Sequence, residues 1–320
     1  MATTHHKLAG LDLIQTTYKK VNDHEIRTDI LIPQKPHTGK RPVIIRFHGG
    51  GLVTGDSLFM DWWSHWVTDL AIESNAIMIS PNYRLLPSVT SAQIYEDIND
   101  FWTWVHSSKF TDLLAAHSTP TEADLNRILT AGESAGGLLS ISLALANTRL
   151  IRACTAAYPC VDLSAEAYSK PRDALPFGVD TPESVFDDAL ASFVDVESSA
   201  ESERRLGFML AGVQHGRFKD LYDAGVDGEV EARYPSVKLE KNKEVPAGGI
   251  TIIHGKQDSV VPVEESEKFV VRAREVLKGK PGGDRISLTV KDGEHGFDAD
   301  LRYEGWLKDS LQGAVTAWLE

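Results

Sequence analysis

The spacing of hydrophobic residues changes after about residue 40. Before that point, Leu11 to Tyr18 and Glu25 to Ile32 alternate apolar and polar residues around the turn Asn22-Asp23-His24, which predicts an antiparallel hairpin. After it, apolar residues form short, nearly continuous runs, which are typical of strands covered on both faces. These runs are Val43 to Phe47, Ala76 to Ser80, Ile128 to Ala131, Ala153 to Tyr158, Ile250 to His254 and Ile286 to Val290.

Between these runs, apolar residues recur at helical spacing. The predicted helices are Trp62 to Glu73, Ala92 to His106, Ala135 to Ala146, Glu264 to Leu277 and Leu301 to Leu319. Strands that alternate with helices over such a length favour a doubly wound sheet. We therefore predict an α/β fold with a mostly parallel central sheet and helices on both faces.

The alternation of buried strands stops between Ser164 and Glu244. Helical spacing persists there in Val185 to Val194 and Arg204 to Leu210, and the segment holds 17 Asp and Glu against 10 Lys and Arg. We interpret residues 164–245 as a helical lid inserted into a catalytic domain formed by residues 1–163 and 246–320. A loosely ordered surface excursion is the alternative. The acidity of a lid would disfavour polyanionic substrates such as acyl-CoA.

The composition of the 320 residues narrows the class of protein. With 42% hydrophobic residues the chain can bury one large core. A formal net charge of −13 argues against a nucleic acid or an anionic membrane as partner, because both bind clustered Lys and Arg. Cys154 and Cys160 lie in or beside an apolar segment, which suits buried thiols in a reducing compartment. Residues 1–7 lack the apolar region of a secretion signal. No segment approaches the roughly 18 to 20 apolar residues that span a bilayer. We therefore expect a soluble cytoplasmic protein.

Two glycine-rich motifs follow predicted strands. His48-Gly49-Gly50-Gly51 follows the run that ends at Phe47, and Gly132-Glu133-Ser134-Ala135-Gly136-Gly137 leads into a Leu-rich helix. The second motif fits G-x-S-x-G, in which a sharp turn from strand to helix lifts a serine clear of the sheet. Small residues at 132, 135, 136 and 137 would keep this turn free of collisions with its neighbours. A dinucleotide-binding turn would need G-x-G-x-x-G, which is absent here.

The two motifs also offer backbone donors. Acyl transfer requires donors aimed at a developing oxyanion, and backbone N–H groups supply them with little reorganisation. Because successive glycines let the main chain approach a substrate, we predict that the amides of Gly50, Gly51 and Ala135 form an oxyanion hole. A purely structural glycine turn is the alternative.

A serine hydroxyl needs a base to remove its proton and an acid to orient that base. For Ser134, His295 is the candidate base, since it lies in a turn-rich loop after the last predicted strand. Asp258 follows the penultimate strand and is the candidate acid, with a helix N-cap as its alternative role. His254 is the main competitor of His295, although we expect it to be structural.

Several other residues near the motifs could either pack in the core or line a pocket. Trp62, Trp63 and Trp66 follow the first glycine motif, and we expect an i, i+4 indole pair to pack a helix onto the core more readily than to line a pocket. Glu133 is expected to be structural. The weaker candidates for lid or pocket positions are Phe59, Phe177 and Phe208.

Together these segments resemble the hormone-sensitive-lipase-like branch of the α/β-hydrolases. The matching blocks are His48 to Gly51, Pro81 to Pro87, Gly132 to Gly137, Tyr158 to Leu163, Gly255 to Asp258 and Glu294 to Phe297. The resemblance implies the α/β-hydrolase fold, the chain order Ser134, Asp258, His295 for the triad, and activity on short to medium acyl esters without metal or cofactor. Two features depart from the branch: about ten residues precede the first strand, too few for a helical N-terminal cap, and Ser88 stands where an acidic residue is common.

The predicted function is that of a serine carboxylesterase that acts on a small apolar ester through an acyl-enzyme. A pathway hydrolase, thioesterase or lyase that uses the same residues to release or cyclise a polyketide-like product is the enzymatic alternative. A non-catalytic receptor for small molecules is the alternative from another class, although such reuse normally forfeits the base, which here is present as His295. The oligomeric state is open, with a possible homodimer.

Overall fold

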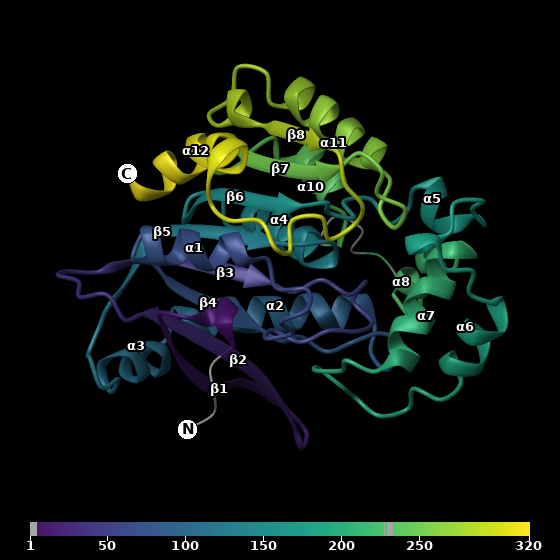
Figure 1. Cartoon of the computed structure of the whole chain (residues 1–320), viewed down its shortest axis with the longest axis horizontal. Helices are drawn as coiled ribbons and strands as arrows, with labels where there is room; N and C mark the ends of the chain where they lie inside the picture. The colour runs from purple at the N-terminus through teal and green to yellow at the C-terminus, as the bar shows by residue number, and fades with distance from the viewer. Residues whose placement is uncertain (1–4, 227, 229–232) are drawn as a thin grey trace.

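An eight-stranded sheet forms the centre of the computed structural model, which describes residues 5–226, 228 and 233–320 (Figure 1). The other positions, 1–4, 227 and 229–232, belong to the N-terminus predicted to lack a signal and to the predicted insert, and they lie outside the described residues. The strands are β1 (Leu11–Val21), β2 (His24–Pro33), β3 (Arg41–Phe47), β4 (Ile77–Pro81), β5 (Ala123–Gly132), β6 (Ile151–Ala157), β7 (Ile250–Gly255) and β8 (Ser287–Lys291).

The strand order is β1-β2-β4-β3-β5-β6-β7-β8. β1 pairs with β2 and β2 with β4 in antiparallel fashion, whereas every pair from β4 to β8 is parallel. The predicted hairpin and the predicted mostly parallel sheet are therefore confirmed. Residues of β3, β4 and β7 are buried along their whole length, as continuous apolar runs predict.

Helices cover both faces of the sheet. The helices α1 (His65–Glu73) and α12 (Gly305–Leu319) share one apolar cluster on one face. On the other face lie α2 (Ser91–Val105), α4 (Ala135–Ala146) and α11 (Val263–Val276). Three shorter helices lie outside the segment between β6 and β7: η1 (His6–Leu8), α3 (Ser108–Ala115) and η3 (Gly283–Arg285).

Two predicted helix starts are wrong by several residues. The first helix was predicted from Trp62, but α1 begins at His65 after Ser64, a residue type that favours the position before a helix. The last was predicted from Leu301, but residues 301–304 are not helical and α12 begins at Gly305. In both cases, apolar residues just before the helix continue its spacing pattern, although their own backbone is not helical.

A run of helices lies between β6 and β7, where the sequence predicts an insert. They are α5 (Glu166–Ser169), η2 (Pro176–Gly178), α6 (Glu183–Leu190), α7 (Glu203–Gln214), α8 (Phe218–Asp223) and α10 (Pro235–Asn242). Figure 1 shows α5 to α8 beyond the ends toward which the parallel strands point. Helix α10 differs from them because it packs against α4 and α11.

Aromatic and charged side chains hold this helical insert together and fix it to the sheet. Phe186 of α6 stacks on Phe208 of α7 with ring centroids 4.5 Å apart. Arg205 of α7 is buried and donates hydrogen bonds to the carbonyl oxygens of Val53 and Leu86, which lie in loops after β3 and β4. These contacts hold α6 and α7 together and against the loops that follow β3 and β4.

Candidate active site

Ser134 occupies the turn between β5 and α4. Its backbone has φ 56° and ψ −120°, a conformation that residues with a side chain seldom adopt, and its N–H donates to the carbonyl of Ala157 at 2.9 Å. A Cβ on Gly136 would collide with the carbonyl oxygen of Phe47, so the turn can lie against β3 only with glycine there. The strained turn therefore places the serine hydroxyl above the carboxyl end of the sheet, as its motif predicts.

His295 and Asp258 meet at the ends of neighbouring strands. His295 lies in the loop after β8 and Asp258 in the loop after β7, and Nδ1 of the imidazole is 2.8 Å from Oδ2 of the carboxylate. The other carboxylate oxygen, Oδ1, accepts hydrogen bonds from the N–H groups of Val260 and Val261 at 2.9 and 2.7 Å. The acid is thereby fixed through both oxygens, and it can hold the imidazole in one orientation.

Two opposing effects set the charge of Asp258. Burial disfavours the carboxylate, but the electrostatic attraction of His295 and the hydrogen bonds from His254 and His295 outweigh it and hold the pKa of Asp258 well below its ordinary value. The group is therefore ionised at neutral pH. An ionised partner on Nδ1 leaves Nε2 of His295 to accept a proton.

His254 lies beside this pair, in β7, and is completely buried. Its Nδ1 is 2.8 Å from the hydroxyl of Ser266, and its Nε2 is 2.9 Å from the carbonyl oxygen of Val261 and 3.3 Å from Oδ2 of Asp258. Both ring nitrogens are occupied by protein groups, and the ring is absent from the lining of the pocket described next. This placement fits the structural role that the sequence predicts for it.

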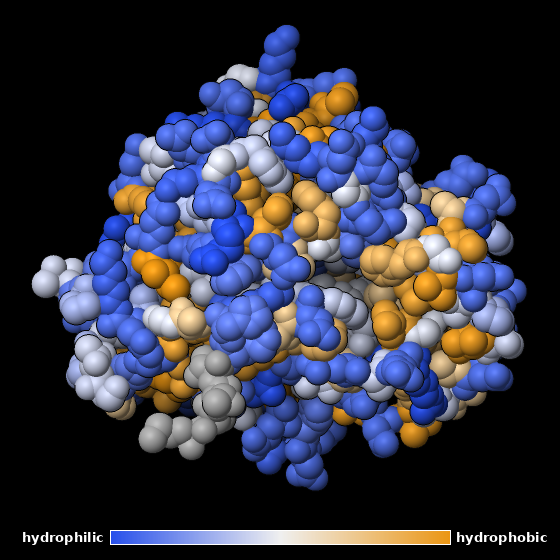
Figure 2. All heavy atoms as spheres, viewed as in Figure 1, coloured by the Kyte–Doolittle hydropathy of each residue, from blue (hydrophilic) through white to orange (hydrophobic). Residues whose placement is uncertain are grey.

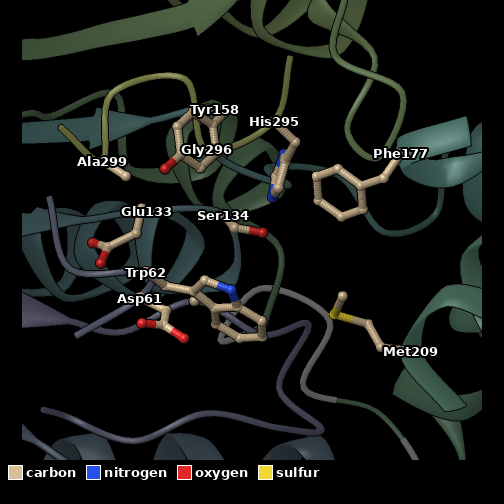
Figure 3. Close-up of a pocket in the computed structure, with 12 residues that line it drawn as sticks. Asp61, Trp62, Glu133, Ser134, Tyr158, Phe177, Met209, His295, Gly296 and Ala299 are labelled. Carbon is tan, nitrogen blue, oxygen red and sulfur yellow. The ribbon is translucent and has the colours of Figure 1, made fainter. Parts of the chain in front are cut away.

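Ser134 and His295 line one pocket of about 180 Å³. Figure 3 shows the serine hydroxyl and the imidazole facing the same space, with Trp62 and Met209 on its other sides. Among the described residues no hydrogen bond joins Ser134 to His295. The structure thus brings the three predicted catalytic residues to one site, with the acid bonded to the base and the serine lining the same pocket as the base.

The first glycine motif runs alongside the serine. Gly49 and Gly50 line the pocket, and a Cβ on Gly49 would lie 3.3 Å from the Cβ of Ser134. Within the described part of the chain, no protein acceptor takes the N–H groups of Gly50, Gly51 or Ala135. These three amides therefore remain available to a ligand, as the predicted oxyanion hole requires.

His48 and Tyr83 support this loop from beneath. Their rings stack with centroids 4.4 Å apart, and the Tyr83 hydroxyl donates to the carbonyl oxygen of His48 at 2.8 Å. Burial lowers the pKa of His48 to about 4, so its imidazole is neutral at physiological pH. The histidine of the motif is a packing element of the loop and does not face the pocket.

Glu133 has a structural partner, as predicted, and also reaches the pocket wall. Its carboxylate pairs with the buried guanidinium of Arg46, which lies 4.1 Å from the ring centroid of Trp63. Burial raises the pKa of Glu133 to about 7, against the opposing charge of Arg46.

Glu294 fixes the backbone of both triad loops, a role that its place in the motif Glu294 to Phe297 does not predict. Its Oε1 accepts hydrogen bonds from the N–H of Ser259 at 2.6 Å and from the N–H of His295 at 2.7 Å. One carboxylate oxygen therefore joins the loop of the acid to the loop of the base. A carboxylate next to the candidate base was the only sequence signal for this role.

Asp298 is a second residue that the sequence analysis missed. Its carboxylate is fully buried and accepts hydrogen bonds from Ser64 Oγ at 2.8 Å, Trp66 Nε1 at 2.7 Å and the Tyr158 hydroxyl at 2.6 Å. The ring of Tyr158 packs against the His295 imidazole at 4.5 Å between centroids. Asp298 therefore links the start of α1 to an aromatic ring that supports the base.

The aromatic candidates divide between core and pocket. Trp66 is buried in the core, as predicted, and so is Trp63. The prediction that Trp62 pairs with Trp66 to pack a helix onto the core is wrong: Trp62 lines the pocket, because it lies in the turn before α1 and not on the helix. Phe177 also lines the pocket, whereas Phe208 is buried inside the insert. Figure 2 shows apolar surface gathered over the insert at the right of the view, beside the hollow that separates it from the sheet domain.

In residues 5–226, 228 and 233–320, no three His, Cys, Asp or Glu side chains lie close enough together to hold a metal ion. None of the helices in that part of the chain is long and apolar enough to cross a bilayer.

Comparison with known proteins identifies the family. Residues 44–203, half of the chain, match the family described as alpha/beta hydrolase fold. The chain belongs to the α/β-hydrolase family. As its motifs predicted, it falls in the hormone-sensitive-lipase-like branch.

Relatives and solved structures agree with this assignment. The α/β-hydrolase chain is 29% identical over 312 residues to the protein named Probable carboxylesterase M8 of Phoma sp., with 94% of each chain covered. It is 30% identical over 197 residues, 59% of its own length and 87% of the relative, to Probable carboxylesterase clz11 of Cochliobolus lunatus. Among solved structures, a fungal esterase from Rhizomucor miehei shares the fold with a TM-score of 0.59 at 20% identity, covering 98% of this chain and 85% of that one. The α/β-hydrolase described here is therefore an enzyme of the carboxylesterase type.

Proposed function

We propose that this α/β-hydrolase cleaves carboxylic esters of short to medium acyl chains through an acyl-enzyme formed on Ser134. The observation that carries the proposal is the convergence of a serine in a strained turn with the bonded pair His295 and Asp258 at one pocket. Three unoccupied backbone amides beside that serine support it.

In the first half of the reaction, the Ser134 oxygen attacks the ester carbonyl carbon while Nε2 of His295 takes the hydroxyl proton. The carbonyl oxygen becomes an oxyanion, and the amides of Gly50, Gly51 and Ala135 donate hydrogen bonds to it. The ionised Asp258 stabilises the imidazolium that forms. The carbon–oxygen bond to the alcohol then breaks, and the imidazolium returns its proton to the departing oxygen.

In the second half, water replaces the alcohol. Nε2 of His295 removes a proton from the water as its oxygen attacks the acyl carbon, and the same amides hold the second oxyanion. When this intermediate collapses, the proton returns to the oxygen of Ser134 and the carboxylic acid leaves.

The character of the pocket fits an apolar ester. Trp62, Tyr158, Phe177 and Met209 are its large apolar and aromatic lining residues, whereas Glu133 and Asp61 are its acidic ones. Such a lining favours neutral, apolar substrates and disfavours polyanionic ones.

Hydrolysis of 4-nitrophenyl esters by the wild type and by Ser134→Ala tests the proposal. We expect turnover by the wild type and no turnover above background for the variant. Ser142→Ala is a matched control, because Ser142 is a buried serine on the same helix and does not line the pocket, so it should retain wild-type activity. Turnover retained by Ser134→Ala would refute the assigned nucleophile.

A second measurement separates acyl transfer from elimination and from simple binding. Rapid quenching during turnover of a slow ester should trap an acyl group on Ser134, detectable by mass spectrometry. A lyase would give product without any acylated protein. A receptor would bind the ester without product and would fail the first assay as well.

A further inference from the structure

A second, much smaller cavity also touches Ser134. It measures about 20 Å³, and its lining is mostly apolar: it includes Gly51, Leu163, Val213, Phe218 and Val261, together with Cys160 and Tyr168. Ser134 and Met209 line both cavities, whereas His295 lines only the larger one. The serine thus lies between two spaces of very different size.

The chemistry of acyl transfer determines which part of an ester enters each space. The departing alcohol oxygen must receive a proton from His295, so the alcohol has to lie in the cavity that His295 lines. The oxyanion occupies the side of the three free amides. The remaining substituent of the carbonyl carbon, the acyl chain, is therefore directed into the small cavity.

The small cavity has about one ninth of the free volume of the larger one, 20 Å³ against 180 Å³. It therefore favours the shortest acyl group, acetyl, over a longer chain. Its walls include buried side chains of the insert: Phe218 and Val213 are 3% exposed, and a Cβ on Gly51 would lie 2.9 Å from the ring of Phe218, so the glycine backbone lies against that ring.

We propose that the enzyme selects acetyl esters of neutral, ring-containing alcohols. This inference rests on the proposed ester hydrolysis and narrows its acyl group from short or medium chains to acetyl. The aromatic wall formed by Trp62, Tyr158 and Phe177 holds the ring of the alcohol. The carboxylate of Asp61 in the same wall disfavours an acidic alcohol, whereas the charge of Glu133 is compensated by Arg46.

A pair of isomeric esters tests which cavity takes which group. Benzyl acetate places the phenyl ring on the alcohol side, and methyl phenylacetate places it on the acyl side, although the two esters have the same composition and both release simple alcohols. We expect kcat/KM for benzyl acetate to exceed that for methyl phenylacetate by at least about tenfold. Equal values, or a preference for methyl phenylacetate, would overturn the assignment.

An acyl series with a cavity-widening variant tests the size limit. For the wild type, kcat/KM should fall at least about tenfold from 4-nitrophenyl acetate to 4-nitrophenyl butyrate, since a rigid site rejects extra methylene groups. Val213→Ala removes part of the cavity wall and should raise the butyrate-to-acetate ratio about tenfold. Val270→Ala is the matched control, because Val270 is a helical valine, likewise 3% exposed, that does not line the cavity.

The outcomes separate this inference from the proposed function. Wild-type activity that depends on Ser134 but is equal for acetate and butyrate would overturn the acetyl preference and leave ester hydrolysis in place. If the butyrate-to-acetate ratio of kcat/KM changes equally in Val213→Ala and Val270→Ala, the small cavity does not hold the acyl chain. Loss of Ser134 dependence on every ester would overturn the proposed function itself.

Discussion

The hydrogen bond between Tyr158 and Asp298 gives a quantitative test of how the base is supported. Tyr158→Phe removes the hydroxyl that donates to Asp298 at 2.6 Å and keeps the ring that packs on His295. Asp298→Ala removes the acceptor and leaves three buried donors without it, those of Ser64, Trp66 and Tyr158. The two changes together form a double-mutant cycle around one bond.

The magnitudes follow from burial and charge. A hydrogen bond to a charged group contributes about 1.5 to 3 kcal/mol, so Tyr158→Phe should lower the free energy of unfolding of the wild type by that amount. In the Asp298→Ala background the hydroxyl has already lost its acceptor, and its removal should cost nothing or should stabilise the fold. The coupling energy is therefore about 1.5 to 3 kcal/mol.

Urea unfolding of the wild type, both single variants and the double variant measures this coupling, and the midpoint and the slope are fitted together. Activity on an acetyl ester provides a second readout. Asp298→Ala should lower kcat more than Tyr158→Phe, because only the former frees both α1 and the ring beneath His295. A coupling energy near zero would refute the claim that Asp298 stabilises the site through Tyr158.

Three further perturbations have expected outcomes of their own. Asp258→Asn should lower kcat by about 10⁴-fold in steady-state assays, because an amide cannot stabilise the imidazolium of His295, and a change below tenfold would contradict the role of the acid. Glu294→Ala should lower kcat/KM about tenfold or more. Glu294→Gln should retain kcat/KM near the wild-type value, because its amide oxygen can still accept from the N–H groups of Ser259 and His295, and equal losses in both variants would argue against this shared acceptor. Burial raises the pKa of Glu133 from its ordinary 4.5 to about 7, so the folded state binds the carboxyl proton more tightly than the unfolded state does. The folded state therefore loses stability as the pH rises from 4.5 to 7. Between pH 5 and pH 8, the free energy of unfolding of the wild type should fall by up to about 3 kcal/mol more than that of Glu133→Gln, and an equal pH dependence of the two proteins would contradict the raised pKa.

Features of the fold that depend on local patterns were predictable. Continuous apolar runs located the six central strands, and β8 differs from its prediction by one residue at each end. Helix α3 was missed because it buries only Phe110 and Leu114, which is too few to stand out as helical spacing. The start of α1 was misplaced because Trp62 continues the spacing of a helix to which it does not belong.

In the site, too, residues within local motifs were predictable, whereas residues that act through distant contacts were not. Ser134, Asp258 and His295 each follow a strand within a local motif, so their convergence at one edge of the sheet follows from the topology. Glu294 and Asp298 act through partners 35 and 140 residues away along the chain, Ser259 and Tyr158, and no local pattern records such contacts. The size of the small cavity likewise depends on side chains from the insert that meet only in the folded protein.

Covalent labelling with paraoxon tests the central claim most directly, because the reagent phosphorylates a serine only where a base activates it. Intact-mass and peptide analysis of the labelled wild type should find one diethylphosphoryl group, attached to Ser134, and His295→Ala should react at least about a hundredfold more slowly. Labelling at a different residue, or an equal rate in His295→Ala, would contradict the proposal that this histidine activates Ser134 for acyl transfer.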